Sequence, residues 1–210
     1  MELRKNYTSA RLLSARVLLS AIVLIGAVTG GNLLLHSGDP ALGYARYVGY
    51  SLSFDYSQRM RLMEMGLGGG PAFESAGNVQ ASWQAEGLEQ FGVIWVSQEG
   101  LPTYMDGTPE DALDYLFSII EMSGTQISVD GALSTRTHDG HEVVIQTFDL
   151  LESGFVIPGI IGAWHCEESG KFLFLYAIHI PDLDHPENLS EELEQIWQGH
   201  LDSLTCHAQR

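Results

Sequence analysis

Basic residues are scarce in this chain. Its 210 residues include ten Lys and Arg against 27 Asp and Glu, which gives a net charge of −17 at pH 7. Four of the ten basic residues lie within the first 16 positions, so the rest of the sequence is strongly acidic. Binding to phosphate groups needs a high density of Lys and Arg. The composition therefore excludes nucleic acid as a partner and disfavours anionic membrane surfaces, whereas it suits solubility, cations or basic partners.

Cysteine is also scarce, because Cys166 and Cys206 are the only two in the sequence. Their wide separation fits no Cys-x-x-Cys metal or redox pattern. In a domain outside the cytoplasm, two such cysteines usually form a structural disulfide; the alternative is two unrelated buried thiols. Both cysteines fall at the ends of predicted elements, which favours the disulfide. Closing a loop of this length stabilises a fold by about 4 kcal/mol in the chain-entropy treatment.

Catalytic motifs are absent as well. The sequence contains no Gly-x-Ser-x-Gly, His-Glu-x-x-His or Ser-x-x-Lys constellation. Its glycine run at Gly68-Gly69-Gly70 lacks the Gly-Lys-Ser/Thr ending of a phosphate-binding loop. We therefore predict a protein that is not an enzyme.

One long hydrophobic run without any charge extends from Val17 to Leu35. As a helix it would span roughly 28 Å, close to the hydrocarbon thickness of a bilayer. The basic residues before it and the acidic chain after it predict a single-pass cell-membrane protein with a cytoplasmic N-terminus; the alternative is a cleaved signal peptide. The predicted parts are a cytoplasmic terminus (1–11), a transmembrane anchor (12–35), a linker (36–46) and an extracytoplasmic domain (47–210).

The remaining chain shows both strand and helix periodicity. Thr108-Pro109-Glu110-Asp111 opens a helix with an N-cap hydroxyl, a proline in the first turn and two acids that favour the helix dipole. Asp139-Gly140 supplies the positive φ that a tight hairpin turn needs. The order strands, helix, four strands, helix predicts an α+β fold in which helices flank an antiparallel sheet. The predicted strands are 50–56, 79–83, 91–96, 127–134, 142–150 and two within 155–179, and the predicted helices are 108–124 and 188–204.

The segment from Gln58 to Phe73 follows no period and is predicted to be a mobile loop. It contains Met60, Met63 and Met65, followed by a glycine-rich stretch. Thioethers are soft ligands that suit Cu(I). The favoured interpretation is a flexible hydrophobic loop that contacts a partner, the bilayer or its own domain.

The order of elements resembles that of a known group. It includes an aromatic first strand, the Thr-Pro-Glu-Asp helix, and a frame made of Trp164, Cys166, Ser169, Gly170 and the terminal Cys206-His207. Over about residues 47–210 this pattern resembles the PsbP-like superfamily, most closely its archaeal extracytoplasmic members. The resemblance implies an α/β/α sandwich around an antiparallel sheet. It also implies non-enzymatic work, since the plant members are extrinsic subunits of the oxygen-evolving photosystem that help to retain its inorganic ions.

Two groups of side chains are candidate metal ligands. His138 and His141 flank the predicted hairpin turn, and with Asp139 they could bind Zn²⁺ or another divalent ion. Asp182 and Asp184 begin a sequence like a calcium loop, but the EF-hand pattern then fails, so at most weak Ca²⁺ binding is expected. The alternatives are a hairpin tip that is polar for solvation alone and acids that favour the dipole of the last helix. Beyond such weak divalent binding, no cofactor is predicted.

Asn188-Leu189-Ser190 is a glycosylation sequon on the predicted outer side, and it also suits the N-cap of the last helix. The other histidines, His207 among them, are predicted to have structural, hydrogen-bonded roles.

These features predict a membrane-anchored accessory or scaffold protein that is displayed outside the cell. Its predicted partners are the lipid bilayer, through the N-terminal helix, and other membrane or cell-surface proteins. The alternative function is an extracytoplasmic carrier. Such a carrier would hold a small molecule in a cavity between sheet and helix, or a Ca²⁺, Zn²⁺ or copper ion through its His, Met and acidic side chains.

Overall fold

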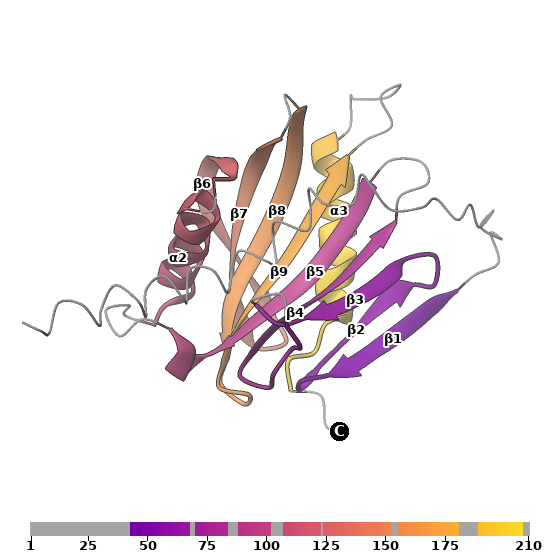
Figure 1. The fold of residues 1–210 in the computed structure, drawn as a ribbon, viewed down its shortest axis with the longest axis vertical. Coiled ribbons are helices and arrows are strands. Elements are labelled where there is room, and N and C mark those ends of the chain that lie inside the picture. Colours follow the sequence, from indigo (N-terminus) through magenta and orange to yellow (C-terminus); the bar gives the residue numbers. More distant parts are fainter. Residues whose placement is uncertain are drawn as a thin grey trace, which may run out of the picture.

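The computed structural model describes residues 43–67, 70–83, 88–101, 107–122, 124–152, 155–180 and 189–207. Over these residues the chain forms a seven-stranded sheet, a separate two-stranded hairpin and two α-helices (Figure 1). The strand order in the large sheet is β3-β4-β5-β9-β8-β7-β6, and all neighbours are antiparallel. The elements are β1 (Tyr44–Gly49), β2 (Leu52–Ser57), β3 (Arg61–Met65), β4 (Ala76–Trp83), β5 (Leu88–Ser97), the short 3₁₀ helix η2 (Gln98–Gly100), α2 (Pro109–Met122), β6 (Gln126–His138), β7 (His141–Glu152), β8 (Phe155–Cys166), β9 (Lys171–Ile180) and α3 (Leu189–Ser203).

Strand β9 lies at the centre of the sheet and is buried on both faces. Phe174 and Tyr176 belong to the core on one face, and Leu173 and Leu175 to the core on the other. A strand covered on both sides needs apolar residues at successive positions rather than at alternate ones. This explains why the sequence of β9 is a nearly continuous apolar run.

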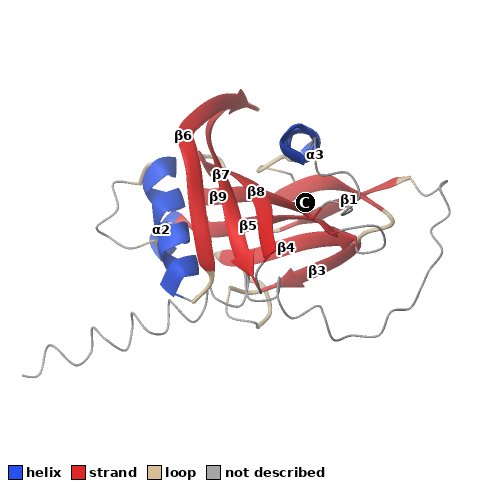
Figure 2. Ribbon diagram, turned by 90° about the horizontal axis from the view of Figure 1, so that it is seen from above, coloured by secondary structure: helices blue, strands red, loops and turns tan. Residues whose placement is uncertain are grey.

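The two faces of the sheet are covered by different elements (Figure 2). Helix α2 packs over β6 to β9 through buried residues such as Leu113 and Leu116. Helix α3 packs on the opposite face, where the wholly buried Trp197 donates its indole N–H to the Leu175 carbonyl at 2.9 Å. The β1–β2 hairpin covers more of that second face through Leu52 and Phe54.

The predicted helix-flanked α/β/α sandwich is wrong. Strands make up most of the described chain, and neither face carries a layer of helices. One face has α2, and the other shares α3 with the β1–β2 hairpin. The physical reason is that two strands, β1 and β3, have too weak a periodicity to be predicted from the sequence. Strand β1 begins within the predicted linker and pairs with β2 in a hairpin that covers part of one face beside α3. Strand β3 lies within the predicted mobile loop and forms an edge of the large sheet.

The predicted helices and the two C-terminal hairpins are confirmed. At the start of α2, Asp111 N donates to Thr108 Oγ1 at 3.2 Å, which is the expected N-cap. In the β6–β7 turn, Asp139 and Gly140 have φ values of 48° and 84°, the left-handed conformation that such a turn requires. Local capping and turn chemistry therefore locate these elements.

Within the described residues, no helix is both long and apolar enough to cross a membrane. The predicted anchor over residues 12–35 and the predicted cytoplasmic terminus lie outside the described residues.

The β1–β2 hairpin is held to the large sheet by a buried ammonium group. Lys171, at the start of β9, is 4% exposed; its Nζ donates to the Tyr50 carbonyl at 2.7 Å and to Glu74 Oε1 at 2.9 Å. The Tyr50 ring stacks on Trp95 with ring centroids 4.7 Å apart. These contacts hold the turn of the β1–β2 hairpin against the start of β9 and against Trp95 of β5.

Gly162 lets α3 approach β8 closely. A Cβ atom at this position would lie 2.5 Å from Trp197 Cζ2 and 2.9 Å from Val143 Cγ1. We expect Gly162→Ala to lower the free energy of unfolding by about 1–3 kcal/mol, because the added methyl group would overlap the wholly buried Trp197 indole. Urea denaturation followed by tryptophan fluorescence measures this loss.

The matched control is Gly199→Ala on the exposed side of α3, where a Cβ would meet nothing within 4 Å. This change should be neutral or should raise the free energy of unfolding by up to about 1 kcal/mol, since Ala favours the helix. Equal losses for the two variants would contradict the close packing of α3 against β8.

Candidate metal centre at the C-terminal disulfide

The segment that follows α3, residues 204–207, is attached to both the hairpin and the large sheet. Ser53 N donates to the Thr205 carbonyl at 2.9 Å, and Thr205 N donates to the Ser53 carbonyl at 2.8 Å. His138 Nε2 lies 2.9 Å from the Leu204 carbonyl oxygen. Because a carbonyl only accepts, this nitrogen carries the proton and donates it. Two backbone hydrogen bonds and one histidine side chain thus dock this segment.

A disulfide between Cys166 and Cys206 joins this segment to the end of β8, with the two Cα atoms 6.3 Å apart. The two cysteines are 0% and 2% exposed, so the bridge is buried beneath its surroundings. This is the pairing that the positions of the two cysteines predict. The disulfide closes a loop of the chain that contains β9 and α3.

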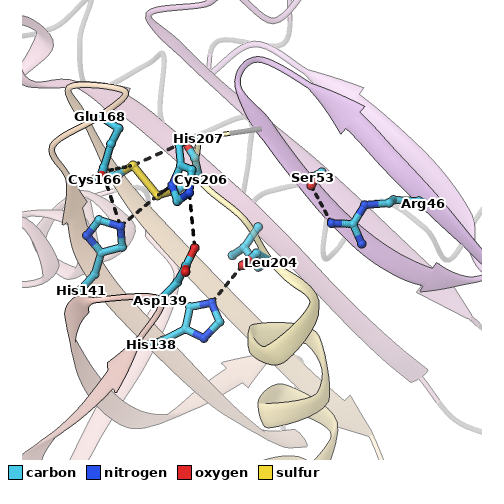
Figure 3. A network of polar contacts seen from close by, with 10 residues as sticks. All are labelled: Arg46, Ser53, His138, Asp139, His141, Cys166, Glu168, Leu204, Cys206 and His207. Carbon is cyan, nitrogen blue, oxygen red and sulfur yellow. Dashed lines mark hydrogen bonds and ion pairs between the residues drawn. A yellow bond between two sulfur atoms is a disulfide. The ribbon is translucent and has the colours of Figure 1, made fainter. Parts of the chain in front are cut away.

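Three further side chains converge on this disulfide from separate elements (Figure 3). His141 begins β7, Glu168 lies in the β8–β9 turn, and His207 follows Cys206. His141 Nε2 is 3.4 Å from Cys206 Sγ and 3.6 Å from Glu168 Oε2, and His207 Nδ1 is 3.6 Å from Cys206 Sγ. One ligand atom from each of these residues and from both cysteines lies within 4.8 Å of all the others.

Strand register explains this convergence. Val144 of β7 pairs with Ala163 of β8. Continued antiparallel to the end of β8, the same register places His141 opposite Cys166. Glu168 follows Cys166 in the tight turn, and His207 is the neighbour of Cys206, so the disulfide brings both of them to the same point.

Asp139 supports one of the two imidazoles. Its Oδ2 lies 3.6 Å from His207 Nε2, whereas His207 Nδ1 faces the disulfide. In metal sites, a carboxylate on the far ring nitrogen of a histidine fixes the tautomer and orients the ring. The pair His207–Asp139 approaches this arrangement, with Nδ1 directed at the centre and a 3.6 Å contact that is longer than a hydrogen bond.

The centre is open to solvent on one side. The His141 side chain is 10% exposed, while those of His207 and Glu168 are 39% and 55% exposed. Glu168 and Asp139 add negative charge in a protein that is already strongly acidic, which favours a cation. Imidazole nitrogens suit zinc, copper and nickel, and zinc also accepts carboxylate oxygen.

The structure separates the predicted metal ligands. His141 belongs to the centre, whereas His138 is directed to the Leu204 carbonyl instead (Figure 3). The predicted calcium-loop residues Asp182 and Asp184 lie outside the described residues, as does the sequon residue Asn188.

The three methionines lie on or beside a paired strand rather than in a mobile loop. Met63 and Met65 belong to β3, which pairs with β4. Met60 is 8% exposed and is part of the core that contains the hairpin, and Met65 is 6% exposed. Two of the three thioethers are therefore buried in the chain's own domain, which is one of the three contacts predicted for this segment.

Glu168 and His207 were not predicted as site residues. The signal that could have found them is the disulfide itself, because residues beside two bridged cysteines must be neighbours in space. His207 adjoins Cys206, and Glu168 lies two positions after Cys166.

Comparison with protein-family models finds no match, and comparison with curated proteins finds none either. Among solved structures, the chain is similar to PA94, a protein of unknown function from Pseudomonas aeruginosa. The two are 11% identical, the similarity covers 79% of this chain and 99% of that one, and the TM-score is 0.44. A likeness this distant gives no guidance on function. The resemblance to the PsbP-like superfamily stays a prediction.

We expect the double variant Cys166→Ala/Cys206→Ala to have a free energy of unfolding lower by about 4 kcal/mol, because the unfolded chain regains the entropy of a loop that spans 40 positions. Chemical denaturation measures the loss. Amide hydrogen exchange at Thr205 should also accelerate, since the docked segment loses its covalent link. An unchanged free energy of unfolding would show that the bridge does not hold the segment.

Proposed function

We propose that this chain is a metal-binding module that takes a divalent transition-metal ion, with Zn²⁺ as the best fit, through His141, His207 and Glu168. The observation that carries the proposal is the convergence of these three side chains, from separate elements, at one disulfide-linked point. Two imidazoles and one carboxylate are a ligand set that zinc accepts, and they leave a fourth position open. This is the second of the two functions that the sequence predicts.

The spacing of the ligand atoms supports zinc. With metal–nitrogen and metal–oxygen bonds of about 2.0–2.2 Å, two ligand atoms of a tetrahedral site lie about 3.4 Å apart. His141 Nε2 and Glu168 Oε2 are separated by 3.6 Å. The Glu168 side chain is 55% exposed, so it has the freedom to close the small remaining gap.

In this site the disulfide acts as a clamp rather than as a ligand. The thiolate is the form of cysteine that binds metals, and a bridged sulfur is not a thiolate. What the bridge provides is a covalent link that holds the segment carrying His207 beside the β8–β9 turn that bears Glu168. A bridged site is suited to an oxidising compartment, which agrees with the predicted extracytoplasmic location of the domain. The accessory role in a membrane complex stays a prediction.

Isothermal titration of the disulfide-intact, full-length chain with ZnCl₂, after chelator treatment, tests the proposal. We expect one Zn²⁺ per chain. His141→Ala and His207→Ala should each weaken binding by at least about tenfold, because the loss of an outer-shell partner alone costs that much. Thermal melting without zinc shows whether each variant is folded.

The control for this titration is His138→Gln, in the same hairpin. The glutamine amide can still donate to the Leu204 carbonyl, and His138 lies outside the ligand set. Zinc affinity should therefore be unchanged in this variant. Absence of zinc binding by the unaltered chain, or an equal loss in His138→Gln, would contradict the proposal.

Asp139→Asn tests the orienting carboxylate separately. Asparagine tolerates the left-handed conformation that Asp139 adopts, so the turn should survive. We expect zinc affinity to fall by about tenfold, while the melting temperature without zinc stays the same. The same titration, paired with a melting curve, provides both values. Unaltered affinity would show that Asp139 does not position His207.

A further inference from the structure

Cys206 Sγ lies at the spacing of a further zinc ligand from both imidazoles, and Cys166 Sγ lies within 4.8 Å of the same ligand atoms. With zinc–sulfur bonds of about 2.3 Å and zinc–nitrogen bonds of about 2.0–2.1 Å, sulfur and nitrogen ligands of a tetrahedral site are about 3.6 Å apart. Cys206 Sγ is 3.4 Å from His141 Nε2 and 3.6 Å from His207 Nδ1. Each imidazole nitrogen is thus separated from this sulfur by about the distance expected between two ligands of one zinc ion.

We propose that the chain with reduced cysteines binds Zn²⁺ through Cys166, Cys206, His141 and His207, so that the thiol state of the two cysteines sets the affinity of the centre. This inference rests on the proposed function, because both forms of the site use the same two histidines. Two thiolates neutralise the charge of the ion, and two cysteines with two histidines form a closed structural zinc site. Zinc binding releases the two thiol protons.

Glu168 distinguishes the two forms of the site. In the bridged chain its carboxylate is the third ligand. In the reduced chain the two thiolates complete the coordination, and the largely exposed Glu168 side chain is not required. The carboxylate is therefore needed in one form and dispensable in the other.

Conversion between the two forms balances as an exchange with a small-molecule disulfide. The thiolates of Cys166 and Cys206 give up two electrons and form the sulfur–sulfur bond, while the bond of the small disulfide breaks and yields two small thiolates. Zn²⁺ then leaves or stays on the histidines and Glu168. Because both sulfurs are at most 2% exposed, such an oxidant reaches them only after the docked segment 204–207 opens. The reduced, zinc-loaded centre should therefore resist oxidation while this segment is docked.

Cobalt substitution tests the inference, since Co²⁺ reports both coordination number and sulfur ligation. The full-length chain is prepared in mild detergent in two states, one disulfide-intact and one reduced with a phosphine in denaturant and refolded without oxygen. We expect the reduced chain to show sulfur-to-cobalt charge-transfer absorption and the visible bands of four-coordinate Co²⁺. Its Zn²⁺ dissociation constant should be on the order of nanomolar or lower by chelator competition. The bridged chain should bind more weakly and show no sulfur band.

Two variants make the comparison specific. Cys166→Ser should weaken the charge-transfer band of the reduced chain. Glu168→Gln should lower the affinity of the bridged chain by at least about tenfold and leave that of the reduced chain unchanged.

The outcomes separate the inference from the proposed function. Equal affinity in the two states, without a sulfur band, would overturn the inference while the three-ligand site stands. Binding by the reduced chain alone, with a sulfur band, would support the four-ligand site and contradict the three-ligand one. No binding in either state would overturn both.

Discussion

The link between Cys166 and Cys206 is the constraint on which the C-terminal half of the structure depends. It returns the chain after α3 to the end of β8 and thereby holds this helix against the sheet. The same segment pairs with Ser53 of β2, so the small hairpin is tied into the closure. The candidate metal centre lies at this closure: the β7–β8 register brings Glu168 near His141, and the bridge links the segment that carries His207 to the same point.

Much of this fold could be predicted from interactions between near neighbours in the sequence. The two strands that were not predicted depend on pairing with other strands. The N-cap of α2 and the Asp139-Gly140 turn identify a helix and a hairpin through interactions between near neighbours. Strands β1 and β3 carry weaker patterns because each is short and has only partial burial. They form by pairing with β2 and β4, so their existence depends on the partner strands rather than on their own periodicity. Without them, the hairpin that covers part of one face beside α3 and the edge strand of the large sheet were both missed.

The candidate site divides in the same way. His141 could be predicted because a histidine beside a tight turn is a recognisable ligand type, and the two cysteines could be paired because they lie at the ends of elements. His207 and Glu168 could not be assigned from spacing, since their proximity arises from the β7–β8 register and from the disulfide together. His138 shows the converse, because the docked C-terminal segment offers it a carbonyl instead of a metal. The ligands come from three segments that are far apart in the sequence, so they form a set only in the folded chain.

The zinc centre is tested most directly by locating the metal in a crystal of the disulfide-intact protein grown with zinc, by anomalous scattering at the zinc edge. We predict one ordered peak about 2.0–2.1 Å from both His141 Nε2 and His207 Nδ1, with Glu168 turned toward it. A peak elsewhere in the molecule, or no ordered zinc with these side chains well defined, would contradict it.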